Sequence, residues 1–496
     1  MDSLVVSHIF RQLFATPSKN CLCVSSHAAL RASLIPQQRR SYALRRNQND
    51  AQGGSNWQQR IDAFPKDMSR QLREYPKVTS FDLRNRLHRP KRVKMLARDF
   101  IEDSLYNPNY GYFSKHATIF NPGEPFDFPT IKDDAEFNRR VSLSYTEYED
   151  KLDEEDPDET RQLWHTPTEL FRPYYGEAIA RYLITNYRLT LFPYHDLIIY
   201  EMGAGNGTLM QNVLDYIRDT DPEVYQRTRF RIIEISSSLA KLQLRNLRKS
   251  PTSSEHLDHV EIINKSIFDW SDYIHSPCFF LALEVFDNFA HDSLRYNPIS
   301  EEPLQGNVLI DEDGEFFEYY EKILDPVAAR YLRIREAASR SPFTTPVSDS
   351  RLLRRLKLAL PFAPNLTRPE WIPTRMMQFF DILRDYFPAH RLIVADFDIL
   401  EQTTPGINAP IVQTRYRRRN VPVTTPYVHQ GYFDIFFPTD FRMMEDIYRA
   451  ITGKLTRVLS HKDFLERWAH VEDTQTKSGE NPMLSWYKNA RVMTTV

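Results

Sequence analysis

Glycine is concentrated at one point of this chain, which is otherwise poor in it. Only 14 of the 496 residues are glycine, yet Gly203, Gly205 and Gly207 fall within five positions, so a local cause is needed. The apolar run at 197–200 predicts a buried strand before them, and a helix is expected to begin near Thr208. Glycine adopts positive φ at low cost, and a helix start offers free N–H groups. The pattern therefore predicts a turn that cradles a ligand.

A carboxylate at the end of that strand indicates which ligand. Glu201 suits a cationic amino group or ribose hydroxyls better than a pyrophosphate, so E-x-G-x-G-x-G favours S-adenosylmethionine over NAD. Glycines at this spacing also occur in turns that bind no ligand. The next strand, expected at 230–234, ends in Glu234, and such an acid holds ribose hydroxyls in Rossmann-like folds. A solvent-facing strand end is the alternative interpretation of Glu234. In a later loop, Ile267 and Phe268 are expected to flank the adenine ring.

The elements that must position these residues form a repeated order of strand and helix. This order predicts an α/β fold with a doubly wound, Rossmann-like parallel sheet, as in class I methyltransferases that use S-adenosylmethionine. Four apolar runs end in an acid, and the carboxyl ends of parallel strands meet at the edge where α/β ligands bind. We therefore expect a polar rim there, built from runs at 197–200, 230–233, 278–283 and 391–395 with Glu201, Glu234, Glu284 and Asp396.

The charge of the whole chain is almost balanced, with 64 Lys and Arg against 66 Asp and Glu. Bulk electrostatics therefore give no sign of a nucleic-acid partner, and no DNA binding is expected. No run approaches the roughly 18 consecutive apolar residues of a membrane span, so no transmembrane segment is expected either.

The first 46 residues differ in composition from the rest. They hold seven Arg and Lys but only one acid, Asp2, and are rich in Ser and Ala. This composition predicts a mitochondrial transit peptide at 1–42, cleaved after Tyr42, and hence a matrix protein; a disordered basic tail is the alternative. Cys278 would be the only cysteine of the mature chain, which excludes an internal disulfide and a cysteine-rich zinc site. We expect no metal site.

The remaining chain is expected to divide into three parts. A polar N-terminal linker at 43–90 precedes a methyltransferase domain at 91–445, and a C-terminal extension follows at 446–496. Within the domain we expect a polar, acidic insertion at about 121–163 and a helical insertion at about 322–373. An insertion between late strands, such as the one at 322–373, often shapes access to a site. The alternative is that it only packs against the rest of the fold.

Four local features can be predicted within the domain: two charged segments, a helix and a hairpin. The run at 147–159 carries nine carboxylates and one lysine, which predicts a solvated, disordered segment, with docking of basic partners as the alternative. The basic cluster at 415–419 predicts a loop with surface ion pairs, or one that binds an acidic group. The segment at 93–105 predicts a helix, and Asp-Gly within 308–317 predicts a hairpin.

Five sequence blocks between residues 107 and 441 stand in the order of a known family. They are N-P-N-Y-G-Y-F at 107–113, T-P-T-E at 166–169 with Y-G-E at 175–177, E-M-G-A-G-N-G-T at 201–208, E-I-S-S-S-L at 234–239 with Gln243 and E-V-F-D at 284–287, and G-Y-F-D-I at 431–435 with D-F at 440–441. Together they resemble the MidA-like family, the mitochondrial protein arginine methyltransferases associated with assembly of respiratory complex I. The family's D-Y-G appears here as Asp396-Phe397-Asp398, so the chain resembles a diverged member.

The resemblance implies an acceptor as well as the donor S-adenosylmethionine. It implies an arginine side chain on a protein substrate, which needs carboxylates to orient the guanidinium and take its proton. Glu284 and Asp287 are expected to align the acceptor, with Glu169 and Asp434 as further candidates. His291 is a candidate proton acceptor, with an ordinary hydrogen-bonded histidine as the alternative.

Three functions follow from the sequence. The first is a mitochondrial protein methyltransferase that modifies arginine on a subunit of a respiratory or other matrix complex during assembly. The second is a non-catalytic assembly factor that keeps the methyltransferase fold, which the altered Asp396-Phe397-Asp398 and the acidic run both favour. The third is a mitochondrial RNA methyltransferase. Against it stand the nearly neutral chain and the lack of an N-P-P-Y motif after the strand at 278–283.

Overall fold

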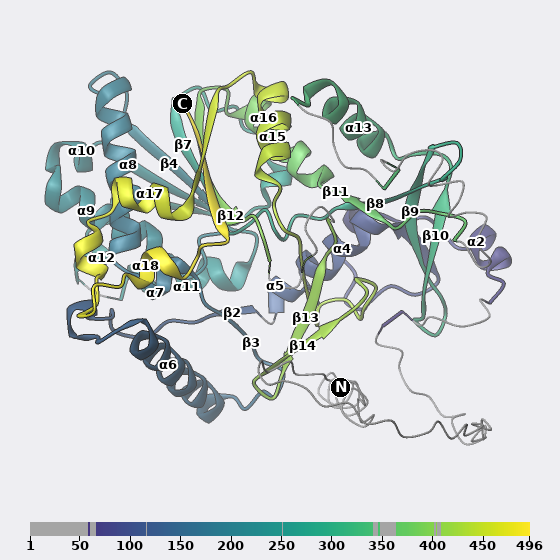
Figure 1. Cartoon of the computed structure of the whole chain (residues 1–496), viewed down its shortest axis with the longest axis horizontal. Coiled ribbons are helices and arrows are strands. Elements are labelled where there is room, and N and C mark those ends of the chain that lie inside the picture. Colours follow the sequence, from purple (N-terminus) through teal and green to yellow (C-terminus); the bar gives the residue numbers. More distant parts are fainter. Residues whose placement is uncertain are drawn as a thin grey trace, which may run out of the picture. The chain divides into compact units, whose positions relative to one another are not determined.

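A seven-stranded sheet organises the protein (Figure 1). Its strands run in the order β16-β17-β12-β7-β4-β5-β6. The five from β12 to β6 are parallel, and β17 is antiparallel to both of its neighbours. The chain winds outward from β4 in one direction and from β7 in the other, which places a topological switch point between them. The Rossmann-like prediction is confirmed by β4 (Leu197–Met202), β5 (Thr228–Ile233), β6 (Val260–Ile263), β7 (Cys278–Leu283), β12 (His390–Phe397), β16 (Thr456–Ser460) and β17 (Ala490–Thr495).

The computed structural model of the chain describes residues 58–59, 66–115, 117–249, 251–340, 346–347, 364–400, 403 and 408–496. The transit peptide expected at 1–42 lies outside the described residues. Within the described ranges, no helix is long and apolar enough to cross a membrane.

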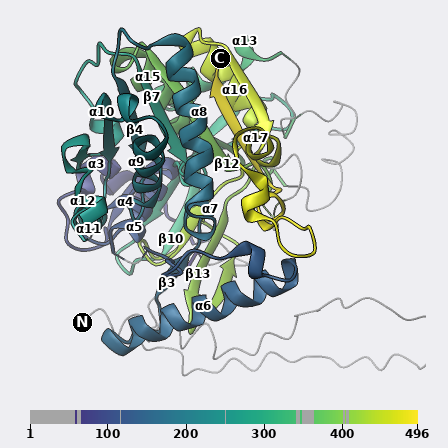
Figure 2. The ribbon, with the colours of Figure 1, turned by 90° about the vertical axis from the view of Figure 1, so that its left-hand side faces the viewer.

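The sheet is buried on both faces, because its central strands are apolar at successive positions. Ile199 and Phe279 belong to one core cluster, whereas their neighbours Tyr200 and Phe280 belong to the other. This continuous apolar character is typical of parallel strands covered on both sides. Figure 2 looks onto the side of α8 and α9. One face is covered by α8 (Tyr174–Thr190), α9 (Thr208–Thr220) and α17 (His461–Trp468), and the other by α13 (Pro326–Ala338), α15 (Thr374–Tyr386) and α16 (Phe441–Thr452).

The C-terminal segment is part of the central sheet. A boundary at 445 was expected, but residues 446–496 supply both β16 and β17. Strand β17 pairs with β12 from Ile393 to Phe397 and covers what would otherwise be an open edge of the sheet. The expected extension is therefore integral to the fold.

A second sheet, which was not predicted, packs beside the first, and its first strand begins at Val93. The predicted helix at 93–105 is a strand over its first four residues and a helix after them. Within the predicted linker at 43–90, Val78 and Leu83 are buried, so its last part is packed against the domain. The predicted hairpin at 308–317 is confirmed. The elements are α2 (Ser69–Glu74), α3 (Ser80–Leu83), β1 (Val93–Leu96), α4 (Ala97–Tyr106), β8 (Asp292–Tyr296), β9 (Pro303–Ile310), β10 (Phe316–Glu321) and β11 (Glu370–Ile372).

The acidic insertion is a long helix, which corrects the prediction of disorder. Helix α6 spans Asp134–Glu155 and places Glu149 in a buried position, where its Oε2 accepts from Arg415 Nη2 at 2.9 Å. Arg418 pairs with Asp150 and Asp153, each at 2.7 Å. The ion-pair interpretation of 415–419 is confirmed. These arginines lie on the hairpin of β13 (Ile411–Tyr416) and β14 (Arg419–Val423), beside β15 (Asp434–Phe436), β2 (Ala117–Ile119) and β3 (Gln162–Trp164).

Candidate functional site

The turn between β4 and α9 has the backbone conformation that its glycines predict. Gly203, Gly205 and Gly207 have φ of 74°, 53° and 79°, a region that side-chain-bearing residues rarely adopt. A Cβ at Gly203 would lie 2.7 Å from Val285 Cγ1, and one at Gly205 would lie 2.5 Å from Ile119 Cδ1. No side chain caps α9, so its first N–H groups face this glycine turn (residues 203–207). The turn is therefore a backbone cradle that only glycine fits.

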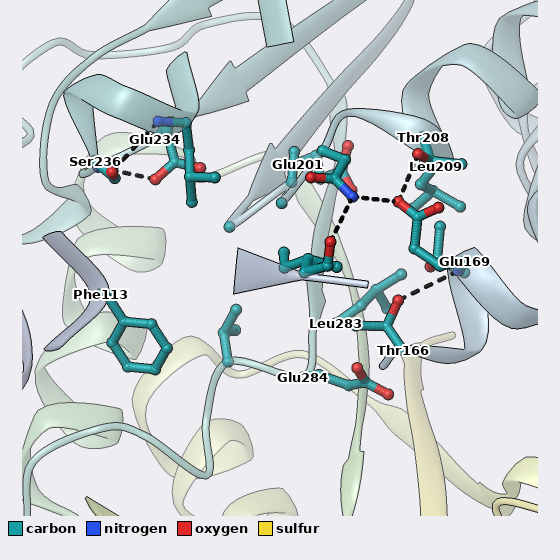
Figure 3. A pocket seen from close by; sticks show the side chains of 18 of the residues that line it. Phe113, Thr166, Glu169, Glu201, Thr208, Leu209, Glu234, Ser236, Leu283 and Glu284 are labelled. Atoms are coloured by element: carbon teal, nitrogen blue, oxygen red, sulfur yellow. Dashed lines mark hydrogen bonds between the residues drawn. The ribbon is translucent and has the colours of Figure 1, made fainter. Parts of the chain in front are cut away.

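A central cavity of about 200 Å³ opens at the carboxyl ends of β4, β5 and β7. Figure 3 shows Glu201, Glu234 and Glu284 around it, one from the end of each strand. Among the described residues that line the cavity there are four glutamates and no lysine or arginine. Three of the four strand-end acids predicted to form a polar rim line this cavity, whereas Asp396 does not. Acidic side chains without a neighbouring cation favour a positively charged ligand.

Burial disfavours the charged forms of Glu201 and Glu234, the acids at the ends of β4 and β5. Burial, together with the neighbouring Glu234, raises the pKa of Glu201 to about 8, and Glu201 Oε2 has no hydrogen-bond partner. Burial raises the pKa of Glu234 to about 7, although Glu234 accepts from Ser236 N at 2.9 Å and from Gln243 Nε2 at 3.0 Å. A buried acid with a free oxygen is stabilised by a cationic or hydroxyl-bearing ligand.

An apolar slot of about 90 Å³ adjoins the central cavity. Gly203 and Glu234 line both spaces, so one ligand can extend from the cavity into the slot. Ile267 and Phe268, from the short helix η3 (Ile267–Asp269), form part of the wall, as predicted for an adenine site. The combination suits a ligand with a charged end and a flat ring.

A second group of buried acids begins at Glu284, a residue with a positive φ of 54°. We call Glu284, Asp287, Asp396 and Asp434 the acid cluster. Burial and the nearby Asp396 raise the pKa of Glu284 to about 8, and burial with Asp396, Asp434 and Glu284 raises the pKa of Asp287 well above its usual range. In the part of the chain that the structure describes, none of the four forms an ion pair, and Asp287 Oδ1 has no hydrogen-bond partner.

The comparison with known sequences decides between the ligands that such a site admits. The sequence model of a family described as "Putative S-adenosyl-L-methionine-dependent methyltransferase" matches residues 178–459, more than half of the chain. The chain belongs to this methyltransferase family.

Two curated relatives are named "Protein arginine methyltransferase NDUFAF7 homolog, mitochondrial". The one from Schizosaccharomyces pombe is 25% identical over 399 residues, which cover 77% of this chain and 81% of the relative. The one from Saccharomyces cerevisiae is 22% identical over 340 residues, which cover 64% and 77%. The family resemblance inferred from the five blocks is confirmed. Both relatives are mitochondrial by name, which supports the mitochondrion as the location of this methyltransferase.

The fold is shared with a solved structure. The crystal structure of a Burkholderia thailandensis protein bound to S-adenosyl-homocysteine matches with a TM-score of 0.51 at 14% identity, covering 81% of this chain and 87% of that protein. This likeness confirms the expected fold of a class I methyltransferase.

S-adenosylmethionine is the cofactor of the family, and the residues present fit it. We propose that Glu201, with its unpartnered oxygen, binds the methionine amino group. Glu234 would accept from the ribose hydroxyls, and the apolar slot with Ile267 and Phe268 would hold the adenine ring. The glycine turn would let the methionine part lie against bare backbone, because no side chain could occupy that space.

Several sequence-predicted residues lie elsewhere than expected. Glu169, a candidate for acceptor alignment, lies against the glycine turn: its Oε1 accepts from Asn206 Nδ2 at 2.8 Å and from Thr208 Oγ1 at 2.7 Å (Figure 3). Gly207 caps α9 but does not line the central cavity. His291 does not line it either, and nor do the predicted acceptor residues Asp287 and Asp434.

The surroundings of His291 favour the alternative of an ordinary core histidine. Its ring stacks on Phe437 with centroids 3.7 Å apart, and Nδ1 lies 2.7 Å from the carbonyl oxygen of Phe289. Burial lowers the pKa of His291 to about 3, so the ring is neutral and donates from Nδ1. The contacts hold this histidine in the core and leave it without access to an acceptor.

Three further residues of the central cavity were not predicted from the sequence. Tyr106, Asn206 and Asn288 all line the central cavity, and the hydroxyl of Tyr106 donates to the carbonyl oxygen of Asn288 at 3.2 Å. Asn288 also donates from Nδ2 to Asp434 Oδ1 at 2.9 Å, which ties the cavity to the acid cluster. The sequence marks these residues only by their position, because each adjoins or lies within one of the five blocks.

The affinity for S-adenosylmethionine is expected to rise with pH. Below about pH 7 both Glu201 and Glu234 are protonated in the free protein, and binding a cation beside them requires a carboxylate. Where binding requires one carboxyl group to ionise, the affinity rises by up to tenfold per pH unit below the pKa of that group. We therefore expect roughly a tenfold gain in affinity between pH 6.5 and 8. Calorimetry in two buffers of different ionisation enthalpy would also report the released proton. A Glu201→Gln variant should bind more weakly and with a flatter profile; an unchanged slope would contradict the assignment of Glu201.

Proposed function

We propose that this methyltransferase transfers the methyl group to an arginine side chain of a protein in the mitochondrial matrix. The observation that carries the proposal is the acid cluster, whose buried carboxylates form no ion pair among the described residues. Buried acids without a counter-cation are unfavourable, and a guanidinium would supply the missing charge with planar, bidentate geometry. The names of the two curated relatives support the same acceptor.

The acid cluster could both orient the acceptor and take its proton. S-adenosylmethionine, when bound, supplies a methyl group activated by its sulfonium. Glu284, which lines the central cavity, and Asp287 would accept N–H bonds from the guanidinium and direct one nitrogen toward the cavity. Because the pKa of a guanidinium exceeds about 12, it must lose a proton as the new C–N bond forms. The carboxylate beside the reacting nitrogen would receive that proton.

The departure from the family motif at Asp398 lies outside the central cavity and the apolar slot. Asp396 accepts from the backbone N–H of Phe286 at 2.8 Å and so holds the segment that carries Asp287. Asp398 pairs instead with Arg491 of β17 at 2.6 Å and lines neither the central cavity nor the apolar slot. The altered residue therefore gives no reason to favour a non-catalytic assembly factor.

Loss of a specific methylated arginine tests the proposal. Mitochondria from cells that lack the protein would be compared with wild type by mass spectrometry of methylated peptides, searching first among subunits of respiratory complexes. We expect at least one arginine to lose its methylation and to regain it when the wild-type protein, but not an Asp287→Asn variant, is restored. An unchanged set of methylated arginines, or a lost methyl group on mitochondrial RNA, would contradict the proposal.

A further inference from the structure

A polar groove of about 840 Å³ runs along the outer side of the glycine turn. It lies between α6, α9 and α11 (Ser237–Leu247), and α6 precedes the other two helices by more than 50 residues in the chain. Asn206 and Thr208 line both the groove and the central cavity, so the two spaces share a wall. None of the roles proposed for the residues that bind the methyl donor involves this groove.

The groove is positively charged although α6 is acidic. Lys151, Arg172 and Lys249 line it, against a single acid, Glu147. Three other acids of α6, Glu149, Asp150 and Asp153, pair with Arg415 and Arg418 of the β13–β14 hairpin. Within the described residues, Lys151 and Lys249 form no ion pair. The groove therefore presents two cations that an acidic ligand could pair with.

The walls also offer hydrogen-bonding groups without partners. Asn212 Oδ1 and Arg172 Nε are buried and have no hydrogen bond in the described residues. One is an acceptor and the other a donor, which is what the alternating N–H and C=O groups of an extended backbone require. Gln211 and Asn246 add further amides along the same wall. Unpaired polar atoms of this kind mark a surface that is completed by a ligand.

We propose that the polar groove binds an extended, acidic segment of the protein substrate, adjacent in sequence to the target arginine. The inference rests on the proposed function, because it assigns the groove to the same substrate. Carboxylates of the segment would pair with Lys151 and Lys249, while its backbone would bond to the amides of α9 and α11. The groove would thus select acidic sequences that the acid cluster, which itself attracts cations, cannot select.

Binding of labelled peptides to the full-length protein tests the inference. We would compare 15-residue peptides with a central arginine and flanks rich in Glu, in Ser and Ala, or in Lys, together with a Glu-rich peptide that lacks the arginine. In a Lys151→Glu and Lys249→Glu double variant, the two Glu-rich peptides should bind about tenfold more weakly, and the Ser/Ala peptide should be unaffected. Affinity for S-adenosylmethionine should be unchanged.

A matched double variant separates groove binding from net charge. Arg139→Glu on α6 and Lys241→Glu on α11 make the same charge change outside the groove and should leave binding of every peptide unchanged. Equal weakening by both double variants, or no preference for acidic flanks, would overturn the inference. If the Glu-rich peptides bind in the groove but no arginine is ever methylated, the groove assignment stands and the proposed acceptor fails.

Discussion

A Gly205→Arg variant is expected to lose measurable affinity for S-adenosylmethionine while retaining the fold. Residue 205 has a φ of 53°, and a Cβ there would lie 2.5 Å from Ile119 Cδ1 at the wall of the central cavity. Left-handed backbone costs a side-chain-bearing residue about 1–2 kcal/mol, which a domain of this size tolerates. The arginine chain would fill the space that the methionine part of the donor needs. We expect at least a hundredfold loss of affinity by calorimetry, which is about 2.7 kcal/mol.

Gly453→Arg is the matched control for the backbone strain. Gly453 ends α16 with a φ of 70°, and nothing lies within 4 Å of a Cβ built there. This variant should share the modest loss of stability and keep the affinity for the donor. If Gly205→Arg binds S-adenosylmethionine as tightly as the wild type does, the glycine turn is not its cradle. If both variants lose the same affinity, strain alone explains the effect.

The glycine turn and the central strands could be predicted because their signals are local. Strands buried on both faces leave continuous apolar runs, and positive φ at three positions leaves three glycines in five residues. Glu201, Glu234 and Glu284 could be placed together because each directly follows or ends such a run. These features depend only on short stretches of sequence and on the rule that parallel strands end at one edge.

The missed features depend on partners that are distant in the chain. Helix α6 looked disordered because the arginines that neutralise its acids, Arg415 and Arg418, follow more than 250 residues later. Strand β17 looked like an extension because its only signal is its pairing with β12, about 100 residues earlier. Glu169 looked like an acceptor-side acid because its contacts with Asn206 and Thr208 cannot be read from its neighbours in sequence. Tertiary contact, rather than local propensity, decided each of these.

An Asp287→Asn variant is expected to lose methyl transfer without losing stability. Burial and three neighbouring acids hold the pKa of Asp287 well above its usual range, which favours the neutral form in the free protein. Asparagine has nearly the same shape as the protonated acid, so the free energy of unfolding should change by no more than about 0.5 kcal/mol. The amide cannot take a proton from the guanidinium or pair with its charge. We therefore expect kcat to fall by about 10²–10⁴, as measured with radiolabelled donor.

Asp396→Asn should separate the support of the site from its chemistry. The Asp396 carboxylate accepts from the backbone N–H of Phe286 at 2.8 Å and of Phe397 at 2.7 Å, and replacing one oxygen with an NH₂ group leaves a buried donor opposite another. This variant should lose about 1–3 kcal/mol of stability, seen as a lower Tm, besides any loss of rate. Asp287→Asn should instead keep its Tm and its affinity for S-adenosylmethionine. Full activity in Asp287→Asn would remove this residue from the acceptor site, whereas a large drop in its Tm would show that it ionises in the free protein.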